Sequence, residues 1–173
     1  TIAVYTGSEP GRRAYEYALS LGAKTEAFDD EALLPVPTDV KFNKINGTLA
    51  AVISGVDRLR AVASLSTMPE VPGRFNRIPV REGVSVIVDY AHTPDALENV
   101  LGELRKKEKW VGCVFGCGGN RDSGKRPLMG EIAGRLCDLV IVTDDNPRKE
   151  DAPEIRGQIL SGAQKKRAII LEI

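Results

Sequence analysis

Residues 84–142 read VSVIVDYAHTPDALENVLGELRKKEKWVGCVFGCGGNRDSGKRPLMGEIAGRLCDLVIV, and this stretch decides the fold. Short apolar runs with the length and composition of buried strands recur here and further on, at 85–88, 110–115, 139–142 and 167–171. Segments with apolar residues at helical spacing separate them, at 93–106, 127–136 and 152–160. Alternating strands and amphipathic helices predict a mainly parallel sheet covered on both faces, in a Rossmann-like α/β domain.

The residues before this stretch predict a smaller α/β unit. Its expected elements are a helix after the first turn that runs through Leu21, strands at 2–5 and 25–28, and an amphipathic helix over 43–65 that Gly55 can break. Proline and glycine cluster at 68–73, where a domain boundary is expected. The prediction is therefore one domain over residues 1–72 and a second over residues 73–173.

Composition excludes several classes of function. The 24 Lys and Arg balance the 24 Asp and Glu, so no net positive charge favours nucleic acid. The apolar runs are far shorter than the roughly 20 residues of a membrane span, so no membrane insertion is expected. Cys113, Cys117 and Cys137 are an odd number in a sequence without a signal-peptide pattern, which predicts reduced thiols in a cytoplasmic protein. They lack the neighbouring ligands of a metal site, so no metal ligand is predicted.

Three polar loops follow the predicted strands. Ligands of parallel sheets bind beyond the carboxyl ends of the strands, which singles out 89–94, 116–126 and 143–148. We therefore expect these loops to meet at one edge of the sheet and to form the ligand site.

The second loop, GCGGNRDSGKR at 116–126, has the features of a phosphate-binding loop. Its glycines allow close approach of the backbone, and the helix that follows presents N–H groups to an anion. Gly119 to Lys125 has P-loop spacing, but Arg126 stands where a Ser or Thr would bind magnesium, so a true P-loop is not predicted. A plain glycine-rich turn with solvated charges is the alternative.

The other two loops carry side chains suited to a ligand. His92 is the single histidine of the chain and can be merely exposed or structural, while Thr93 and Pro94 are typical of a helix start. Pro147 favours an extended Asn146, whose amide can face a ligand together with the Arg148 guanidinium. Such a pair can bind the head group of an amino acid, although a plain turn with an exposed arginine is the alternative.

Four segments resemble successive signatures of the UDP-N-acetylmuramoyl-tripeptide synthetases, which are Mur ligases. They are VPGRF at 71–75, VDYAHTPDALENVL at 88–101, VFGCGGNRDSGKRPLMGEIA at 114–133 and VIVTDDNPRKEDAPEI at 140–155. Upstream, FNKINGTLAAV at 42–52 resembles the end of the family's central domain. The resemblance implies that residues 1–72 are an α/β remnant of a central ATPase domain and that residues 73–173 are most of the C-terminal ligase domain.

The resemblance also implies the chemistry. Family members phosphorylate the terminal carboxylate of a UDP-muramyl peptide with ATP, and the amino group of the incoming residue then attacks the acyl phosphate during peptidoglycan synthesis. The Asp-Asn-Pro-Arg sequence at 145–148 is associated with members that add meso-diaminopimelate. The implied substrates are UDP-muramyl dipeptide and meso-diaminopimelate, and ATP and Mg²⁺ are implied as cofactors, bound mainly by central-domain residues that this sequence lacks.

Individual roles follow from the same resemblance. Catalytic roles fall to Lys125, His92 and Asp89, which are expected to face one cleft and to contact the nucleotide or its phosphates. The further residues expected to contact the nucleotide are Asn43 and Arg74. The residues expected to hold the amino acid are Arg121, Asp145, Asn146, Pro147 and Arg148.

Other functions remain open at this point. The sequence lacks the central-domain P-loop and the Gly-x-Gly-His-Glu segment of the amino-acid pocket, so we expect a fragment that is inactive by itself. The alternatives are a lysine-adding ligase and a Rossmann-like module that binds a nucleotide or an amino acid without catalysis. An NAD-dependent oxidoreductase is disfavoured, because Gly116 to Gly119 lacks the spacing of a dinucleotide-binding loop.

Overall fold

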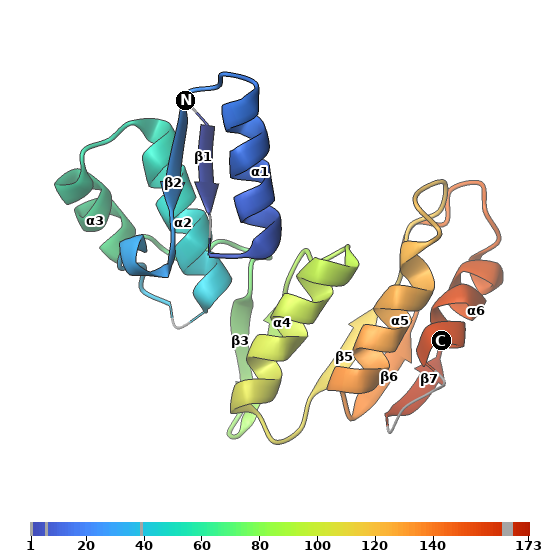
Figure 1. Ribbon diagram of the computed structural model, residues 1–173. Helices are drawn as coiled ribbons and strands as arrows, with labels where there is room; N and C mark the ends of the chain where they lie inside the picture. The colour runs from blue at the N-terminus through green and yellow to red at the C-terminus, as the bar shows by residue number, and fades with distance from the viewer. Residues whose placement is uncertain (1, 6, 39, 164–167) are drawn as a thin grey trace. The chain divides into compact units, whose positions relative to one another are not determined.

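The computed structural model describes residues 2–5, 7–38, 40–163 and 168–173 (Figure 1). Its contacts divide the chain into two compact units, Thr1–Glu70 and Val71–Ile173. The division lies two residues before the predicted boundary. The assignment of the first unit to a central ATPase domain stays a prediction.

The first unit is a two-stranded parallel sheet with helices. Strand β1 (Ile2–Tyr5) pairs with β2 (Thr25–Phe28), and α1 (Glu9–Ser20) connects them. A 3-10 turn, η1 (Asp30–Ala32), leads to α2 (Lys41–Ser54) and α3 (Arg58–Ser66). Gly55 ends α2 with a φ of 67°, a left-handed conformation that glycine adopts without strain, so the predicted break is confirmed. The small core of this unit includes Leu34, Val36, Ala61 and Leu65.

The second unit begins with a β-hairpin that the sequence analysis missed. Strand β3 (Asn76–Arg81) pairs antiparallel with β4 (Val84–Val88) across Glu82 and Gly83, and Gly83 has a φ of 72°. The prediction that 85–88 belongs to the parallel sheet was wrong, since β4 hydrogen-bonds to β3 in a separate sheet. A two-residue connection with a glycine favours this local pairing, because little chain entropy is lost in closing the hairpin.

The predicted parallel sheet is confirmed for the remaining three strands. They are β5 (Gly112–Phe115), β6 (Leu139–Val142) and β7 (Ile169–Glu172), paired in that order. The helices of the unit are α4 (Pro94–Lys107), α5 (Lys125–Leu136) and α6 (Ala152–Ala163). Each lies at its predicted place, with ends shifted by a few residues. The chain is therefore an α/β protein.

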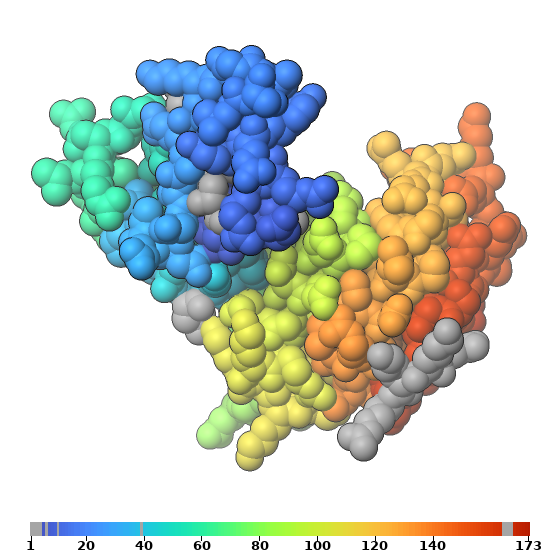
Figure 2. Space-filling model, viewed as in Figure 1, coloured from blue at the N-terminus to red at the C-terminus, as the bar shows by residue number. Residues whose placement is uncertain are grey.

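The helices cover one face of this sheet, and the prediction of two covered faces was wrong. Cys113, Val140 and Ile170 lie side by side in the register and pack with the helices, whereas Val114 and Leu171 on the other face are 64% and 47% exposed. The strand order explains this. Right-handed crossovers between consecutive neighbouring parallel strands place all connecting helices on the same side. Figure 2 shows α4, α5 and α6 as adjoining bands, in keeping with the contacts of α5 on both neighbours.

Candidate functional site

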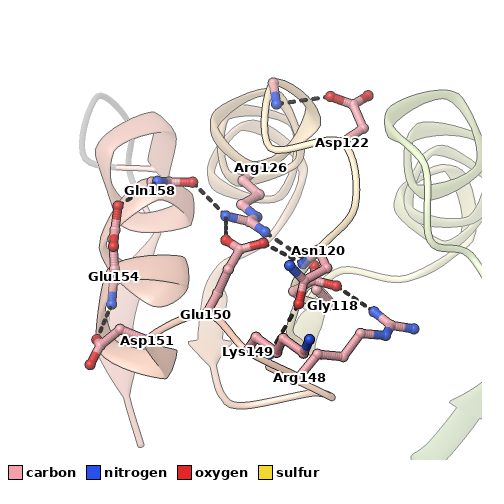
Figure 3. Close-up of polar contacts among 12 residues, drawn as sticks. Gly118, Asn120, Asp122, Arg126, Arg148, Lys149, Glu150, Asp151, Glu154 and Gln158 are labelled. Atoms are coloured by element: carbon pink, nitrogen blue, oxygen red, sulfur yellow. Dashed lines mark hydrogen bonds and ion pairs between the residues drawn. The ribbon is translucent and has the colours of Figure 1, made fainter.

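The loops that follow β5 and β6 are joined to each other along their length. The N–H of Thr143 donates to the carbonyl of Phe115 at 3.1 Å, and the N–H of Gly119 donates to the carbonyl of Asn146 at 2.8 Å. A Cβ atom at Gly119 would lie 1.9 Å from the carbonyl oxygen of Pro147, so only glycine allows this approach. The glycine-rich loop and the Asp-Asn-Pro-Arg loop therefore form one structural unit, as Figure 3 shows.

Arg126 connects this pair of loops to α6 from inside the protein. Its side chain is fully buried, and one guanidinium nitrogen donates to Glu150 and to Gln158, each at 2.8 Å. A second nitrogen donates to the carbonyl of Gly118 at 3.2 Å. The residue that occupies the magnesium-binding position of a P-loop sequence thus points inward and contacts a carboxylate. A plain turn with solvated charges is excluded for this residue.

Glu150 lies between the buried arginine and the glycine-rich loop. The hydrogen bond from Arg126 holds the pKa of the Glu150 carboxyl below its ordinary value, and the N–H of Asn120 lowers it further. Asn120 in turn accepts a hydrogen bond on its side-chain oxygen from the N–H of Lys149, at 3.0 Å. The carboxylate is therefore ionised at neutral pH and bound on two sides.

Asp89, predicted to be catalytic, fixes the backbone at the end of β4. One carboxylate oxygen accepts the N–H of Phe75 and the other accepts the N–H of Ala91, both at 2.7 Å. Phe75 has a φ of 51°, a strained conformation for a side chain of that size. The carboxylate thereby ties the Pro-Gly-Arg-Phe segment to the Asp-Tyr-Ala-His loop. This local function explains the aspartate at the strand end, while its catalytic role stays a prediction.

Arg74 and His92 both contact the ring of Tyr90, which lies in the Asp-Tyr-Ala-His loop. The Arg74 guanidinium lies 4.8 Å from the centre of the Tyr90 ring, a cation–π contact, and the His92 ring packs edge-on at 5.0 Å. Nδ1 of His92 lies 3.1 Å from the carbonyl oxygen of Tyr90. If this nitrogen carries the proton, Nε2 is the free acceptor of the neutral ring.

Lys125 lies in the cleft that sequence analysis predicted for it. Its ammonium donates to the carbonyl of His92 at 2.6 Å, and the cleft is lined by Lys125, Asp89 and His92 together. Helix α5 starts at Lys125, and this position places the lysine ammonium next to the Asp-Tyr-Ala-His loop. The predicted juxtaposition is confirmed, whereas the assigned catalytic roles are not tested by geometry.

The residues predicted to hold an amino acid divide into two groups. Those that line the same cleft are Arg121, Asp145, Asn146 and Arg148. Pro147 belongs to the loop backbone, where its carbonyl accepts the N–H of Glu150 at 3.0 Å. Asn43 lies on α2 of the first unit and is half-buried, so its contact with a nucleotide stays a prediction.

The sequence analysis did not identify Arg126 and Glu150 as residues of the site. A signal for Arg126 exists, because it shares helical spacing with Met129, Gly130 and Ala133 and therefore lies on the buried face of α5. A charge on a buried helix face requires a partner. No comparable signal identifies Glu150 as that partner, since the contact joins residues 24 positions apart.

Two further properties concern metals and membranes. Across the described residues, no group of three or more His, Cys, Asp and Glu side chains is placed to hold a metal ion. The helices of the described chain include none with the length and apolar character required to cross a bilayer.

Burial raises the pKa of the Cys117 thiol, so this residue of the glycine-rich loop is a poor nucleophile.

Comparisons with known proteins identify the family. The family described as Mur ligase, glutamate ligase domain, matches residues 73–172. A UDP-N-acetylmuramoyl-L-alanyl-D-glutamate--2,6-diaminopimelate ligase of Geobacter metallireducens is 52% identical over 129 residues, which are 70% of this chain and 25% of that protein. The protein of the same name from Rhizobium meliloti is 40% identical over 158 residues, 88% of this chain and 32% of that protein.

Solved structures give the same result. A structure of a UDP-N-acetylmuramoyl-L-alanyl-D-glutamate--2,6-diaminopimelate ligase matches with a TM-score of 0.55 at 27% identity, covering 99% of this chain and 42% of that chain. Mycobacterium tuberculosis folylpolyglutamate synthase, complexed with ADP and AMPPCP, shares the fold with a TM-score of 0.66 at 18% identity, covering 99% and 45%. The chain spans about a quarter to a third of the curated relatives cited above. Given a family match over most of the second unit and these identities, the chain belongs to the Mur ligase family.

Proposed function

We propose that the protein carrying this chain is an ATP-dependent ligase that adds meso-diaminopimelate to UDP-N-acetylmuramoyl-L-alanyl-D-glutamate in the cytoplasm. Support comes from the names of its relatives, which state this substrate and this amino acid. The reaction joins the terminal carboxylate of the muramyl dipeptide to an amino group, after ATP has converted the carboxylate to an acyl phosphate. Cell-wall synthesis is the process that such a ligase serves.

The observation that carries the proposal is the position of Arg148 at the cleft. One guanidinium nitrogen donates to the carbonyl of Gly119, and Arg121 lines the same cleft. Diaminopimelate ends in an additional carboxylate where lysine has only its amine. A guanidinium held in one orientation can bind that carboxylate through two parallel hydrogen bonds, which a lysine substrate cannot offer.

In this proposal ATP occupies the side of the cleft that Lys125 and His92 line. Lys125 lines the cleft and supplies positive charge, and Arg74 contacts Tyr90, which also lines it. His92 supplies a nitrogen that can donate to or accept from a phosphate group. In the proposal Lys125 stabilises the charge of the transferred phosphate, while Asp89 keeps the loop in place. The Mg²⁺ that accompanies ATP finds no suitable group of ligands among the described residues, so none of them is assigned to it.

The test is an assay of the whole protein with ATP and the UDP-muramyl dipeptide. Phosphate release and product mass are measured with meso-diaminopimelate and with lysine in parallel. We expect a specificity constant for diaminopimelate that exceeds that for lysine by tenfold or more, as one charge-assisted contact of roughly 1.5 to 3 kcal/mol requires. A preference for lysine would overturn the substrate assignment. Binding of ATP without turnover on either amino acid would show a binding module and overturn the proposal itself.

A further inference from the structure

A single peptide group lies between the substrate-facing arginine and the acidic residue behind it. This group joins Gly119 to Asn120. Its carbonyl accepts a hydrogen bond from the guanidinium of Arg148, and its N–H donates to a carboxylate oxygen of Glu150. Since the peptide group is planar, the direction of its N–H determines the direction of its carbonyl.

Glu150 is itself held by Arg126. The second carboxylate oxygen of Glu150 accepts from the Arg126 guanidinium at 2.8 Å, and the arginine side chain is 0% exposed. The same nitrogen also donates to Gln158, and another donates to the carbonyl of Gly118. A buried guanidinium with three partners on three segments has little freedom to move, so the carboxylate has little freedom either.

The backbone conformation of Arg148 opposes its local preference. Arg148 has a φ of 52°, in the left-handed region that arginine rarely adopts, and Asn120 has a φ of 51°, which asparagine tolerates better than most residues. Among the described residues, Phe75 is the one other non-glycine residue with a positive φ. Such conformations persist where surrounding contacts enforce them. Here those contacts are the hydrogen bonds on both sides of the Gly119–Asn120 peptide group and the bond from Lys149 to Asn120.

We infer that Arg126 and Glu150 are positioning residues for the amino-acid subsite, which set the orientation of Arg148 through the Gly119–Asn120 peptide group. The inference rests on the proposed function, because it takes Arg148 as the residue that binds the distal carboxylate. Neither Arg126 nor Glu150 lines the cleft, so neither contacts a substrate there. Their effect reaches the substrate through one peptide group and one guanidinium.

Glu150→Gln is the informative substitution. Glutamine has one acceptor oxygen, whereas Glu150 accepts from both Arg126 and Asn120. One of these donors then faces an amide NH₂, and the peptide group loses its fixed direction. We expect the KM for diaminopimelate to rise roughly tenfold, the equivalent of one weakened charge-assisted contact, with the KM for ATP unchanged. Glu150→Asp keeps both acceptor oxygens and the charge, and should rescue part of the effect.

The matched control is Glu98→Gln. Glu98 of α4 forms an ion pair with Arg135, which lies on α5 as Arg126 does, but the side chains of Glu98 and Arg135 are exposed, at 50% and 41%. This variant should leave both KM values at wild-type level. A merely structural role of Glu150 would lower the yield of folded enzyme and therefore kcat for every substrate, without changing one KM selectively.

A double-mutant cycle decides whether the effect passes through Arg148. The whole protein is assayed as wild type, Glu150→Gln, Arg148→Lys and the double variant. We expect the Glu150→Gln effect on the KM for diaminopimelate to disappear in the Arg148→Lys background, because lysine lacks the fork that the peptide group orients. Additive effects would overturn the inference, as would an unchanged KM in folded Glu150→Gln protein. A wild-type enzyme that does not use diaminopimelate would instead overturn the proposed function.

Discussion

The contact between α5 and α6 allows a direct test of the packing. Gly130 of α5 lies against the backbone of Ile159 on α6, and a Cβ atom at Gly130 would lie 2.0 Å from the Ile159 carbonyl oxygen. Ordinary van der Waals contact begins near 3.4 Å. The obstacle is backbone, which cannot rotate away as a side chain can. Gly130→Ala therefore forces the two helices apart.

The magnitude follows from two opposing effects. Overpacking of a well-filled contact destabilises a protein by roughly 1 to 3 kcal/mol, and a backbone obstacle favours the upper end of that range. Alanine stabilises a helix by about 1 kcal/mol relative to glycine, which offsets part of this loss. The expected net loss in the free energy of unfolding is about 2 kcal/mol. The side chains most affected are those of Met129 and Ile159, which are 1% and 0% exposed and whose packing depends on this contact.

Gly157 on α6 is the matched control. A Cβ atom there would meet nothing within 4 Å, so Gly157→Ala should stabilise the unit by about 0.5 to 1 kcal/mol through helix propensity alone. Urea unfolding followed by the fluorescence of Trp110, the single tryptophan, reports on the second unit. The two variants should differ by about 3 kcal/mol, which is about 2 M in urea midpoint. A midpoint of Gly130→Ala at or above wild type would show that the helices do not touch there.

Three further outcomes are expected. Arg148→Ala in the whole protein should lower the specificity constant for diaminopimelate by roughly tenfold to a hundredfold while ATP affinity is unchanged, and a retained preference in competition assays would contradict the assignment. His92→Ala should lower turnover by about tenfold or more through loss of a phosphate contact, and normal phosphate release would remove His92 from the site. Arg105 lowers the pKa of Asp138, and the N–H of Val111 lowers it further, so the carboxylate stabilises the fold above its unfolded pKa of about 3.9 and this contribution is lost as pH falls through the folded value. Asp138→Asn should therefore be less stable at pH 7 and show a flatter loss of stability below about pH 4 in acid titration monitored by circular dichroism.

Sequence patterns predicted the elements that depend on local periodicity. The strands of the parallel sheet and the helices α4, α5 and α6 follow from apolar spacing and from the helix-start signals, of which the N-cap Thr93 accepts the N–H of Ala96 at 3.3 Å. The approach of the two loops after β5 and β6 followed from the rule for carboxyl ends of parallel strands, whereas the loop at 89–94 follows β4, which lies outside that sheet. These predictions need no knowledge of which distant residues meet.

The features that the sequence did not predict depend on pairing between distant residues. The apolar run of β4 resembles those of the parallel strands, and the turn at Glu82 and Gly83 that pairs it with β3 was overlooked. Asp89 was assigned to the nucleotide by resemblance, but its bonds to Phe75 and Ala91 show a function in holding the loop that only the folded chain reveals. Helical spacing places Arg126 on the buried face of α5, but nothing local identifies Glu150 as its partner, because the two residues are 24 positions apart.

The start of α5 joins the two halves of the site. Lys125 and Arg126 are consecutive, so their side chains leave the helix about 100° apart. The first contacts the carbonyl of His92, on the side proposed for the nucleotide, and the second contacts Glu150, which supports the side proposed for the amino acid. Pro127 follows directly, and its carbonyl would lie 1.8 Å from a Cβ atom at Gly162, so this turn is also pressed against α6. The packing of α5 on α6 therefore holds both Lys125 and Arg126, and through Arg126 the loop that carries Glu150, by the same contact. A shift of α5 should impair both substrates at once, whereas loss of Glu150 should impair the amino acid alone.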